Sequence, residues 1–459
     1  MNQQNRQRRG IVNETLLEKK IKQKTAVIAT IGLGHVGLTT TAMFADVGFH
    51  VIGSDIKKEV VDLVASGRSH INEPGISGLV KKNVKEGRLR ATTNVLEAAN
   101  GADIEIICVQ TPMNDKNEPD ESFVEKACNS IVGGMAKGKL VVIESTVSPG
   151  TTRNTLVKIF EGGTHLKCGR DFWLAHCPER ITIGRAVEDF ANSTRVVGGY
   201  DAKSAEIAAE LFKAVTKGQV LVTDCTSAEV AKLAENAYRY VNIAFANELA
   251  LLCERLGVDV IETIRLANTH PRVNVHNPGP GVGGPCLPKD TYLLLHSAKK
   301  NRSSSEVVEA SGKTNEYMPM HTVSLLAKAL SEAGKDIRRS KVVVLGSAYR
   351  GGVDDARNSP AERVVNKLIN LGVTVAVYDP HCKESFGGKR IRDIVEGAKE
   401  ADALLIITDH EEFRELDLQA IRSVMSKKPL IVDGRRVIDP ADATKIGFKY
   451  VGIGFGFNA

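Results

Sequence analysis

The chain has 459 residues, of which 42% are hydrophobic and 25% charged. This composition is typical of a globular protein and the length allows about three domains. Because no stretch approaches the roughly 20 consecutive apolar residues of a membrane span, and the first residues lack the apolar core of a secretion signal, we expect a cytoplasmic protein with no membrane partner.

The net charge of +6 comes mainly from the N-terminus, where Met1 to Lys24 hold seven Lys/Arg and two Glu. We interpret residues 1–24 as a basic, disordered tail and expect no nucleic-acid partner. The eight cysteines contain no Cys-x-x-Cys pair, and the eleven histidines show no ligand spacing with cysteine or carboxylate. Reduced thiols and no metal site are therefore expected.

From residue 25 to residue 222, short β-branched runs alternate with helical segments. This pattern predicts an α/β domain with a parallel, doubly wound sheet. The expected strands are Ala26 to Ile31, His50 to Ser54, Ile104 to Val109, Leu140 to Glu144 and Thr194 to Val197.

The first expected strand runs into the fingerprint Gly32-Leu33-Gly34-His35-Val36-Gly37, which opens a helix. The first glycine permits a tight turn, the second lets a pyrophosphate approach backbone N–H groups, and the third allows the helix to pack closely on the strand. Asp55, at the end of the second strand, would accept from both ribose hydroxyls and repel a 2′-phosphate. The predicted cofactor is therefore NAD rather than NADP.

Two further strand ends are rich in hydroxyl groups, at Val109-Gln110-Thr111-Pro112 and at Glu144-Ser145-Thr146-Val147-Ser148. They lie where the nicotinamide half of a cofactor is expected. From the spacing alone, functional and structural roles for Thr111 and Thr146 remain equally open.

Residues 223–330 have a helical pattern, beginning with a long helix from Ser227 to about Leu256. On this helix Lys232 and Asn236 share one face, a pattern that by itself is more typical of a solvated surface. Gly and Pro residues predict a loop from Asn277 to Pro288, and Lys299 to Ser305 is expected to form another.

The first of these loops ends with Gly283-Gly284-Pro285-Cys286-Leu287-Pro288 and is followed directly by Lys289 and Asp290. Its glycines would allow a ligand to approach the backbone, and Lys289 and Asp290 supply a cation and a potential base beside the thiol. In a chain with a hydride acceptor, this setting suggests oxidation through a covalent thioester.

Residues 331–459 return to an α/β pattern, which predicts a second Rossmann-like domain. The expected strands are Lys341 to Leu345, Thr374 to Tyr378, Ala403 to Thr408 and Pro429 to Val432. The predicted fold is thus α/β, with two doubly wound domains joined by a long helix and an all-helical central domain.

Several blocks in a fixed order resemble the UDP-glucose/GDP-mannose dehydrogenase family of nucleotide-sugar 6-dehydrogenases, over nearly all of the chain after the tail. They are the glycine fingerprint, Ser145 to Gly150, His176-Cys177-Pro178-Glu179-Arg180, Ala231 to Asn236, Pro278 to Gly284 with Cys286 and Asp290, and Asp354 to Pro360. The resemblance implies a four-electron oxidation of a sugar C6 alcohol with two NAD⁺. Cys286 would capture the aldehyde and carry the thioester.

The resemblance also implies roles for individual residues. Lys232 and Asn236 would steady the oxyanion at C6, and Asp290 would orient or deprotonate water. Glu179 would contact the sugar and assist proton transfer, and Thr146 would hold a water or the nicotinamide. The remaining implied contacts are Arg357 and Thr111 to the cofactor, and Arg180, Gly283, Arg350, Arg435 and a neighbouring subunit's Arg272 to the UDP-sugar.

An arginine acting across a subunit boundary implies a homodimer or a larger homo-oligomer. Glu179-Arg180-Ile181-Thr182 and His270-Pro271-Arg272-Val273-Asn274 resemble the branch that acts on N-acetylated UDP-hexosamines. Within this branch, the run from His270 to Asn274 favours UDP-N-acetyl-D-mannosamine as substrate. Pro288-Lys289-Asp290 is more typical of the UDP-glucose branch, so UDP-N-acetylglucosamine and UDP-glucose stay open as substrates.

Two other classes of protein are alternatives. A non-catalytic nucleotide-sugar sensor could keep the same binding residues, but it would have no need for Cys286. A two-electron 3-hydroxyacid dehydrogenase also combines an NAD domain with a helical domain, but it would use neither Cys286 nor a second α/β domain.

Overall fold

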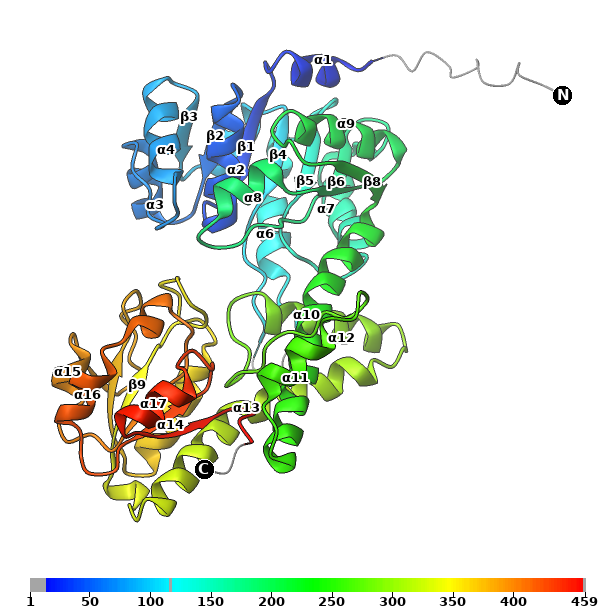
Figure 1. The fold of residues 1–459 in the computed structure, drawn as a ribbon. Helices are drawn as coiled ribbons and strands as arrows, with labels where there is room; N and C mark the ends of the chain where they lie inside the picture. Colours follow the sequence, from blue (N-terminus) through cyan, green and yellow to red (C-terminus); the bar gives the residue numbers. More distant parts are fainter. Residues whose placement is uncertain (1–13, 115–117, 457–459) are drawn as a thin grey trace. The chain divides into compact units, whose positions relative to one another are not determined.

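The computed structural model describes residues 14–114 and 118–456, and it divides into two compact units that meet between Leu233 and Ala234. The boundary falls within the long helix α10 (Cys225–Leu256), visible in Figure 1. The helix predicted from Ser227 to about Leu256 is confirmed and begins two residues earlier, at Cys225. None of the helices in the described ranges is both long and apolar enough to cross a membrane.

An eight-stranded sheet forms the centre of the first unit, and its strands are rich in β-branched residues. In spatial order the strands are β3 (Leu89–Thr92), β2 (His50–Ser54), β1 (Val27–Ile31), β4 (Ile104–Ile107), β5 (Leu140–Ile143), β6 (Trp173–His176), β7 (Arg195–Gly199) and β8 (Val220–Asp224). Neighbouring strands are parallel except that β7 runs antiparallel to β6. The expectation of a wholly parallel sheet was wrong at this pair.

Alternate residues of each strand enter two separate cores, one on each face of the sheet. Leu140 and Val142 pack on one face, whereas Val141 and Ile143 pack on the other. One face is covered by α1 (Leu16–Lys22), α2 (His35–Asp46), α3 (Lys58–Ala65), α4 (Ile76–Lys85), α8 (Ala186–Asn192) and α9 (Ala202–Lys213). The other is covered by α5 (Val95–Asn100), α6 (Ser122–Ile131), η2 (Val132–Gly134), η3 (Thr152–Leu156) and α7 (Val157–Thr164).

Helix α1 corrects the prediction of a disordered tail for its part of residues 1–24. Thr15 and Glu18 form a capping box at its start, and Leu17 and Ile21 are buried in the core of the first unit. Lys203 on α9 pairs with Glu18 at 2.7 Å. The basic residues Arg6, Arg8 and Arg9 lie outside the described residues.

The second unit begins with a helical region and ends with a six-stranded sheet. The helices are α11 (Val260–Ala267), α12 (Leu287–Lys300) and α13 (Glu306–Glu332), and they follow the C-terminal part of α10. The predicted loop ending at Pro288 is shorter than expected, because α12 begins at Leu287. Proline, which lacks an N–H donor, is tolerated there because N–H groups in the first turn have no carbonyl acceptor within the helix.

All strand pairs of the second sheet are parallel. The order is β11 (Lys389–Arg390), β10 (Thr374–Tyr378), β9 (Lys341–Leu345), β12 (Ala403–Ile406), β13 (Leu430–Asp433) and β14 (Lys449–Gly452). One face is covered by α13 and α14 (Pro360–Asn370), and the other by α15 (Ile394–Gly397), α16 (Leu418–Val424) and α17 (Pro440–Ile446), with η4 (Ile337–Arg339) and η5 (Glu411–Glu415) in the connections. The predicted fold class, with two Rossmann-like domains and a helical region, is confirmed.

Candidate active site

The glycine turn after β1 has the shape that a dinucleotide requires. Gly32 has a φ of +93°, and a Cβ there would lie 2.6 Å from the carbonyl oxygen of Cys108. A Cβ on Gly37 would lie 1.8 Å from the carbonyl oxygen of Gly32, so both positions must be glycine for packing reasons. A Cβ on Gly34 would instead meet no atom within 4 Å, and this open position lies directly before His35 and Val36, the first residues of α2. The free space at a helix N-terminus fits a pyrophosphate.

Asp55 follows β2 and is partly exposed beside this turn. Its Oδ2 accepts from the N–H of Leu33 and its Oδ1 from the N–H of Lys57, both at 2.9 Å. Each carboxylate oxygen can accept a second hydrogen bond. Asp55 can therefore accept from ribose hydroxyls in this position, and the residues present fit NAD.

The ends of β4 and β5 are joined by two of the predicted site residues. The hydroxyl of Thr111 donates to the carbonyl oxygen of Thr146 at 2.8 Å. Thr111 is buried and Thr146 half-buried. This contact gives Thr111 a structural function, while the side chain of Thr146 belongs to the turn that follows β5.

The turn from Ser148 to Thr152 is held by two carboxylates that sequence analysis did not single out. Glu121, at the start of α6, accepts from the N–H of Ser148 at 2.6 Å and from the hydroxyl of Thr151 at 2.9 Å. Glu229, on α10, accepts from the N–H groups of Gly150 at 2.5 Å and Thr152 at 2.9 Å. The only signal for Glu229 in the sequence is an acidic residue three positions before Lys232 in a helical pattern.

Lys232 is buried and contacts Glu179. Its Nζ donates to the carbonyl oxygen of Glu179 at 2.7 Å and to Oε1 of the same residue at 3.0 Å. Burial alone would raise the pKa of Glu179, but the Lys232 ammonium and the N–H of Ile181 outweigh burial and lower it. Two of the predicted catalytic residues thus form an ion pair in the first unit, which contradicts a solvated surface for Lys232.

Asn236, Asp290 and Cys286 come together in the second unit. Asn236 Nδ2 donates to Asp290 Oδ2 at 2.5 Å, and Arg239 donates to the other end of the Asn236 amide. Asp290 lies one helical turn after Cys286, and its N–H donates to the Cys286 carbonyl at 2.8 Å. Asp290 Oδ1 is buried without a hydrogen-bond partner among the described residues, and lies 3.4 Å from Lys289 Nζ. It is an acceptor available to a water or a substrate.

Cys286 is the residue at the N-terminal end of α12. The partial positive charge of a helix N-terminus stabilises a thiolate, as does a nearby cation. The Arg357 guanidinium interacts with Cys286 but is also paired with Asp355 at 2.6 Å, so the helix start is the main support for a thiolate here. This environment favours a nucleophilic thiol.

The glycine run before Cys286 packs against the segment that contains Arg357. The N–H of Gly284 donates to the Arg357 carbonyl at 2.9 Å. A Cβ on Gly283 would lie 2.6 Å from the carbonyl oxygen of Asn358 and 2.9 Å from Cβ of Tyr349. In the described structure, close packing therefore explains Gly283, whereas its predicted contact with substrate remains a prediction.

The other predicted arginines are distributed over both units. Arg350 lies in the loop after β9 beside Tyr349, and Arg435 Nε donates to the carbonyl of Ile407 at 2.9 Å. Arg180 donates to the carbonyl of Thr194 at 3.0 Å, and Arg272 is exposed after α11. Their contacts with substrate, like that of Arg357 with cofactor, remain predictions.

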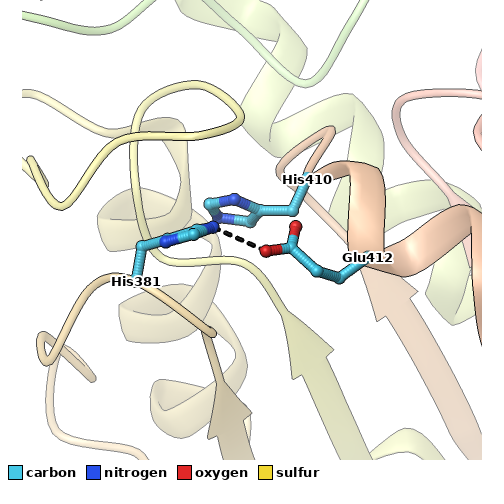
Figure 2. Close-up of side chains that lie close together, drawn as sticks. All are labelled: His381, His410 and Glu412. Atoms are coloured by element: carbon cyan, nitrogen blue, oxygen red, sulfur yellow. Dashed lines mark ion pairs between the residues drawn. The ribbon is translucent and has the colours of Figure 1, made fainter. Parts of the chain in front are cut away.

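One group of metal-ligand side chains lies close together among the described residues. Figure 2 shows His381, His410 and Glu412, whose ligand atoms are within 4.8 Å of one another. However, His410 Nε2 is 3.0 Å from Asp379 Oδ2, and His410 Nδ1 accepts from the N–H of Gly352 at 3.1 Å. With both ring nitrogens in use, His410 has no lone pair to offer a metal unless one of these bonds breaks.

Comparison with known proteins identifies the family. Family models of the UDP-glucose/GDP-mannose dehydrogenases match three segments: the NAD binding domain at residues 26–216, the central domain at 226–317 and the UDP binding domain at 343–440. The chain is 43% identical over 429 residues to UDP-N-acetyl-D-mannosamine dehydrogenase of Pyrococcus horikoshii, covering 94% of this chain and 99% of that protein.

Solved structures agree with these matches. The structure of UDP-D-ManNAc dehydrogenase from Pyrococcus horikoshii aligns with a TM-score of 0.88 and 42% identity, covering 94% of this chain and 100% of that one. NDP-N-acetyl-D-galactosaminuronic acid dehydrogenase from Methanosarcina mazei Go1 aligns with a TM-score of 0.84 and 34% identity, covering 97% and 99%. The chain therefore belongs to the UDP-glucose/GDP-mannose dehydrogenase family and is an NAD-dependent nucleotide-sugar dehydrogenase.

Proposed function

We propose that this enzyme oxidises the C6 alcohol of UDP-N-acetyl-D-mannosamine to the uronate, using two NAD⁺ per sugar and a covalent intermediate on Cys286. The observation that carries the proposal is the position of Cys286 at the start of α12, with Asp290 one turn further on and Arg357 nearby. NAD, when bound, supplies the hydride acceptor for both oxidations.

The chain's residues have distinct tasks in the proposed reaction. In the first oxidation C6 loses a hydride, and the hydroxyl proton passes to a base, leaving an aldehyde. The Cys286 thiolate then adds to the aldehyde carbon, and Lys232 and Asn236 donate hydrogen bonds to the oxygen that becomes negative. Loss of a second hydride from this thiohemiacetal gives a thioester.

Hydrolysis completes the proposed sequence. Asp290 takes a proton from a water, which attacks the thioester carbon and releases the carboxylic acid and the Cys286 thiolate, and the acid then loses its proton to solvent. The buried and hydrogen-bond-free Oδ1 of Asp290 supports this role, and the Asn236 bond to Oδ2 fixes the carboxylate's orientation.

Substrate identity is tested by incubating the purified enzyme with NAD⁺ and a set of UDP-sugars. The set contains UDP-N-acetylmannosamine, UDP-N-acetylglucosamine, UDP-N-acetylgalactosamine and UDP-glucose. We expect two NADH per molecule of UDP-N-acetylmannosamine. Higher kcat/KM with another sugar would reassign the substrate and leave the chemistry unchanged.

The Cys286 intermediate is tested with Cys286→Ala and a control at a buried thiol, Cys128→Ala. The first variant should bind NAD⁺ normally but form no thioester and fail to complete the second oxidation. Cys128→Ala should keep the stoichiometry of two NADH. Full turnover by Cys286→Ala would contradict a covalent mechanism.

We also propose a homodimer in which Arg272 of one copy reaches the UDP-sugar of the other. Support comes from the exposed apolar side chains along the C-terminal part of α10: Tyr238, Phe245, Leu252 and Leu256. The first three are spaced by seven residues and Leu256 follows four residues after Leu252, so all four lie along one apolar stripe, which a second copy of the same helix would cover. Phe245→Glu should give a monomer by light scattering, whereas Leu96→Glu, at an exposed apolar residue of α5, should remain dimeric.

A further inference from the structure

The turn between β5 and η3 has the features of an anion-binding helix start that is filled by the protein itself. Three N–H groups, of Ser148, Gly150 and Thr152, point to acceptors at this turn, and both acceptors are carboxylates. N–H groups at the beginning of a helical segment stabilise negative charge. Glu121 and Glu229 thus stabilise the turn that follows Thr146.

Glu229 differs from Glu121 in the helix on which it lies. Glu121 belongs to α6, which covers the same face of the sheet as the turn. Glu229 belongs to α10, one helical turn before Lys232. Because residues three apart lie on neighbouring positions of one face, Glu229 and Lys232 bring the same part of α10 against two different strand-end segments.

Those two segments carry site residues of both ligands. Glu229 binds the turn Ser148–Thr152, which follows the predicted cofactor-side residue Thr146, while Lys232 binds Glu179 in the segment after β6. All of these residues lie in the first unit. A change at Glu229 would therefore shift the cofactor-side turn and the turn of α10 that carries Lys232 together.

Burying the Glu229 carboxylate costs free energy, so stability alone does not explain why a carboxylate lies at this position. The side chain is 1% exposed, and burial raises its pKa to about 7. The bonds from Thr152 and Gly150 oppose this rise, and the Glu121 carboxylate adds to it. A buried carboxylate is weak evidence for stability, since a well-packed apolar residue often serves as well. Orientation of the turn is the function that an apolar residue could not perform.

We propose that Glu229 is a positioning residue of the dehydrogenase, which joins the cofactor-side turn Ser148–Thr152 to the turn of α10 that bears Lys232. The inference rests on the proposed function insofar as it treats Thr146 and Lys232 as site residues.

The test compares Glu229→Gln with two other variants. The amide keeps the size of the side chain but can accept only one of the two N–H groups in this geometry, since its NH₂ group would face the other. We expect Glu229→Gln to lower kcat with the UDP-sugar by about 10-fold or more, because small misplacements of reacting groups are expensive. It should also raise the Kd and KM for NAD⁺ while the KM for the UDP-sugar and the melting temperature change little.

Glu121→Gln loosens the same turn without touching α10, so it should weaken NAD⁺ binding and leave kcat near that of the wild type. Glu105→Gln is the matched control, because Glu105, on β4 of the same unit, is an equally buried carboxylate whose pKa burial also raises to about 7. It should alter thermal stability and leave the affinity for NAD⁺ unchanged.

The inference is overturned if folded Glu229→Gln has wild-type kcat and NAD⁺ affinity, or if Glu105→Gln weakens NAD⁺ binding to the same extent. Should Glu229→Gln fail to fold, unchanged NAD⁺ affinity in Glu121→Gln would overturn it. Direct titration with NAD⁺ needs no sugar, so a wild-type enzyme that rejects every UDP-sugar would contradict the proposed function without deciding the role of Glu229.

Discussion

The two sheets repeat one Rossmann-like arrangement, yet the aspartate at the end of the second strand of each has opposite surroundings. In the first sheet β1 lies between β2 and β4, and in the second β9 lies between β10 and β12. Ile31 pairs with Ser54 and Leu345 with Tyr378, so Asp55 and Asp379 occupy equivalent positions. The glycines after β1 and β9, Gly32 and Gly346, even share φ values of +93° and +95°.

Asp55 is partly exposed, with one N–H donor on each oxygen. Asp379 is buried and surrounded by donors: Oδ2 accepts from the N–H groups of Ser347 at 2.7 Å and Ala348 at 2.9 Å, and lies 3.0 Å from His410 Nε2. Its Oδ1 accepts from the N–H groups of His381 and Cys382. Burial would favour the neutral acid, but the bonds from His410, Cys382 and Ala348 outweigh burial and hold the pKa of Asp379 below its usual value.

The difference shows how one fold can serve two ligands. The first sheet leaves its aspartate open for ribose hydroxyls and begins α2 directly after the glycine turn. In the second sheet the aspartate is used to hold the loop after β9, and α14 does not begin until Pro360. The intervening loop carries Arg350, a predicted substrate contact, in place of a helix N-terminus, and a guanidinium group is suited to binding a diphosphate.

The largest expected effect is that of Asp379→Ala on stability. Removing this carboxylate leaves His410 and four N–H groups, three of them in buried hydrogen bonds, without their acceptor, so we expect a loss of about 3–5 kcal/mol. Thermal unfolding should show a markedly lower midpoint, and NAD⁺ affinity in the folded fraction should be unchanged. A midpoint equal to that of Asp55→Ala would contradict the contrast between the two aspartates.

A second difference between the sheets predicts a pH effect. Glu105 lies in β4 opposite Ala29, where the second sheet has Leu404 opposite Val343. Burial raises the pKa of Glu105 to about 7, although Lys139 at 2.9 Å opposes the rise. Because the folded-state pKa lies above the unfolded value, the folded protein favours the neutral acid. The contribution of Glu105 to the free energy of unfolding is therefore lost as the pH rises towards and through 7.

Glu105→Gln should remove that loss, which amounts to roughly 3 kcal/mol at most. We therefore expect the stability of Glu105→Gln relative to the wild type to increase between about pH 5 and pH 8. Thermal unfolding of both proteins across this range measures the difference. A difference that does not depend on pH would show that Glu105 is already ionised at pH 5.

Asp55→Ala addresses the open aspartate of the first sheet. Losing hydrogen bonds from a carboxylate to ribose hydroxyls should weaken NAD⁺ binding about 10- to 100-fold, with little change in melting temperature. Affinity for NADP⁺ should fall far less, since the repulsion of a 2′-phosphate is removed as well. Isothermal titration with each cofactor is the measurement, and equal losses for both would argue against the ribose contact.

The smallest expected effect concerns the ion pair outside Asp379. His381 Nε2 is 2.7 Å from Glu412 Oε1, and both side chains are exposed (Figure 2). Exposed pairs contribute about 1 kcal/mol or less, so His381→Ala should scarcely change the melting temperature. A loss as large as that of Asp379→Ala would mean that the outer pair is essential for the loop.

Sequence alone predicted the features that depend on local pattern. Hydrophobic runs located β1, β2, β9 and β10, and the glycine fingerprint located the cofactor turn. The direction of β7 was not predictable, because apolar periodicity is the same for parallel and antiparallel strands. Whether Asp379 is open or saturated depends on N–H groups and a histidine from three separate loops, which no local pattern contains.

The candidate site was predictable to a similar degree. Cys286, Asp290 and Asn236 were predicted from motifs and resemblance, and the structure brings them together. Glu121 and Glu229 were missed because each is a single acidic residue far along the chain from its hydrogen-bond donor. Glu121 is 27 residues from Ser148, and Glu229 is 79 residues from Gly150. Only tertiary structure separates such residues from ordinary surface carboxylates.

Helix α1 has a practical consequence for anyone who shortens this protein. Removing residues 1–24 would look harmless because they are highly charged. It would, however, expose the part of the core against which Leu17 and Ile21 pack. Two apolar side chains of this size contribute about 3 kcal/mol or more together, and the exposed patch would invite aggregation during purification. Any shortened form should keep Thr15 and Glu18, which cap the helix that holds this buried pair in place.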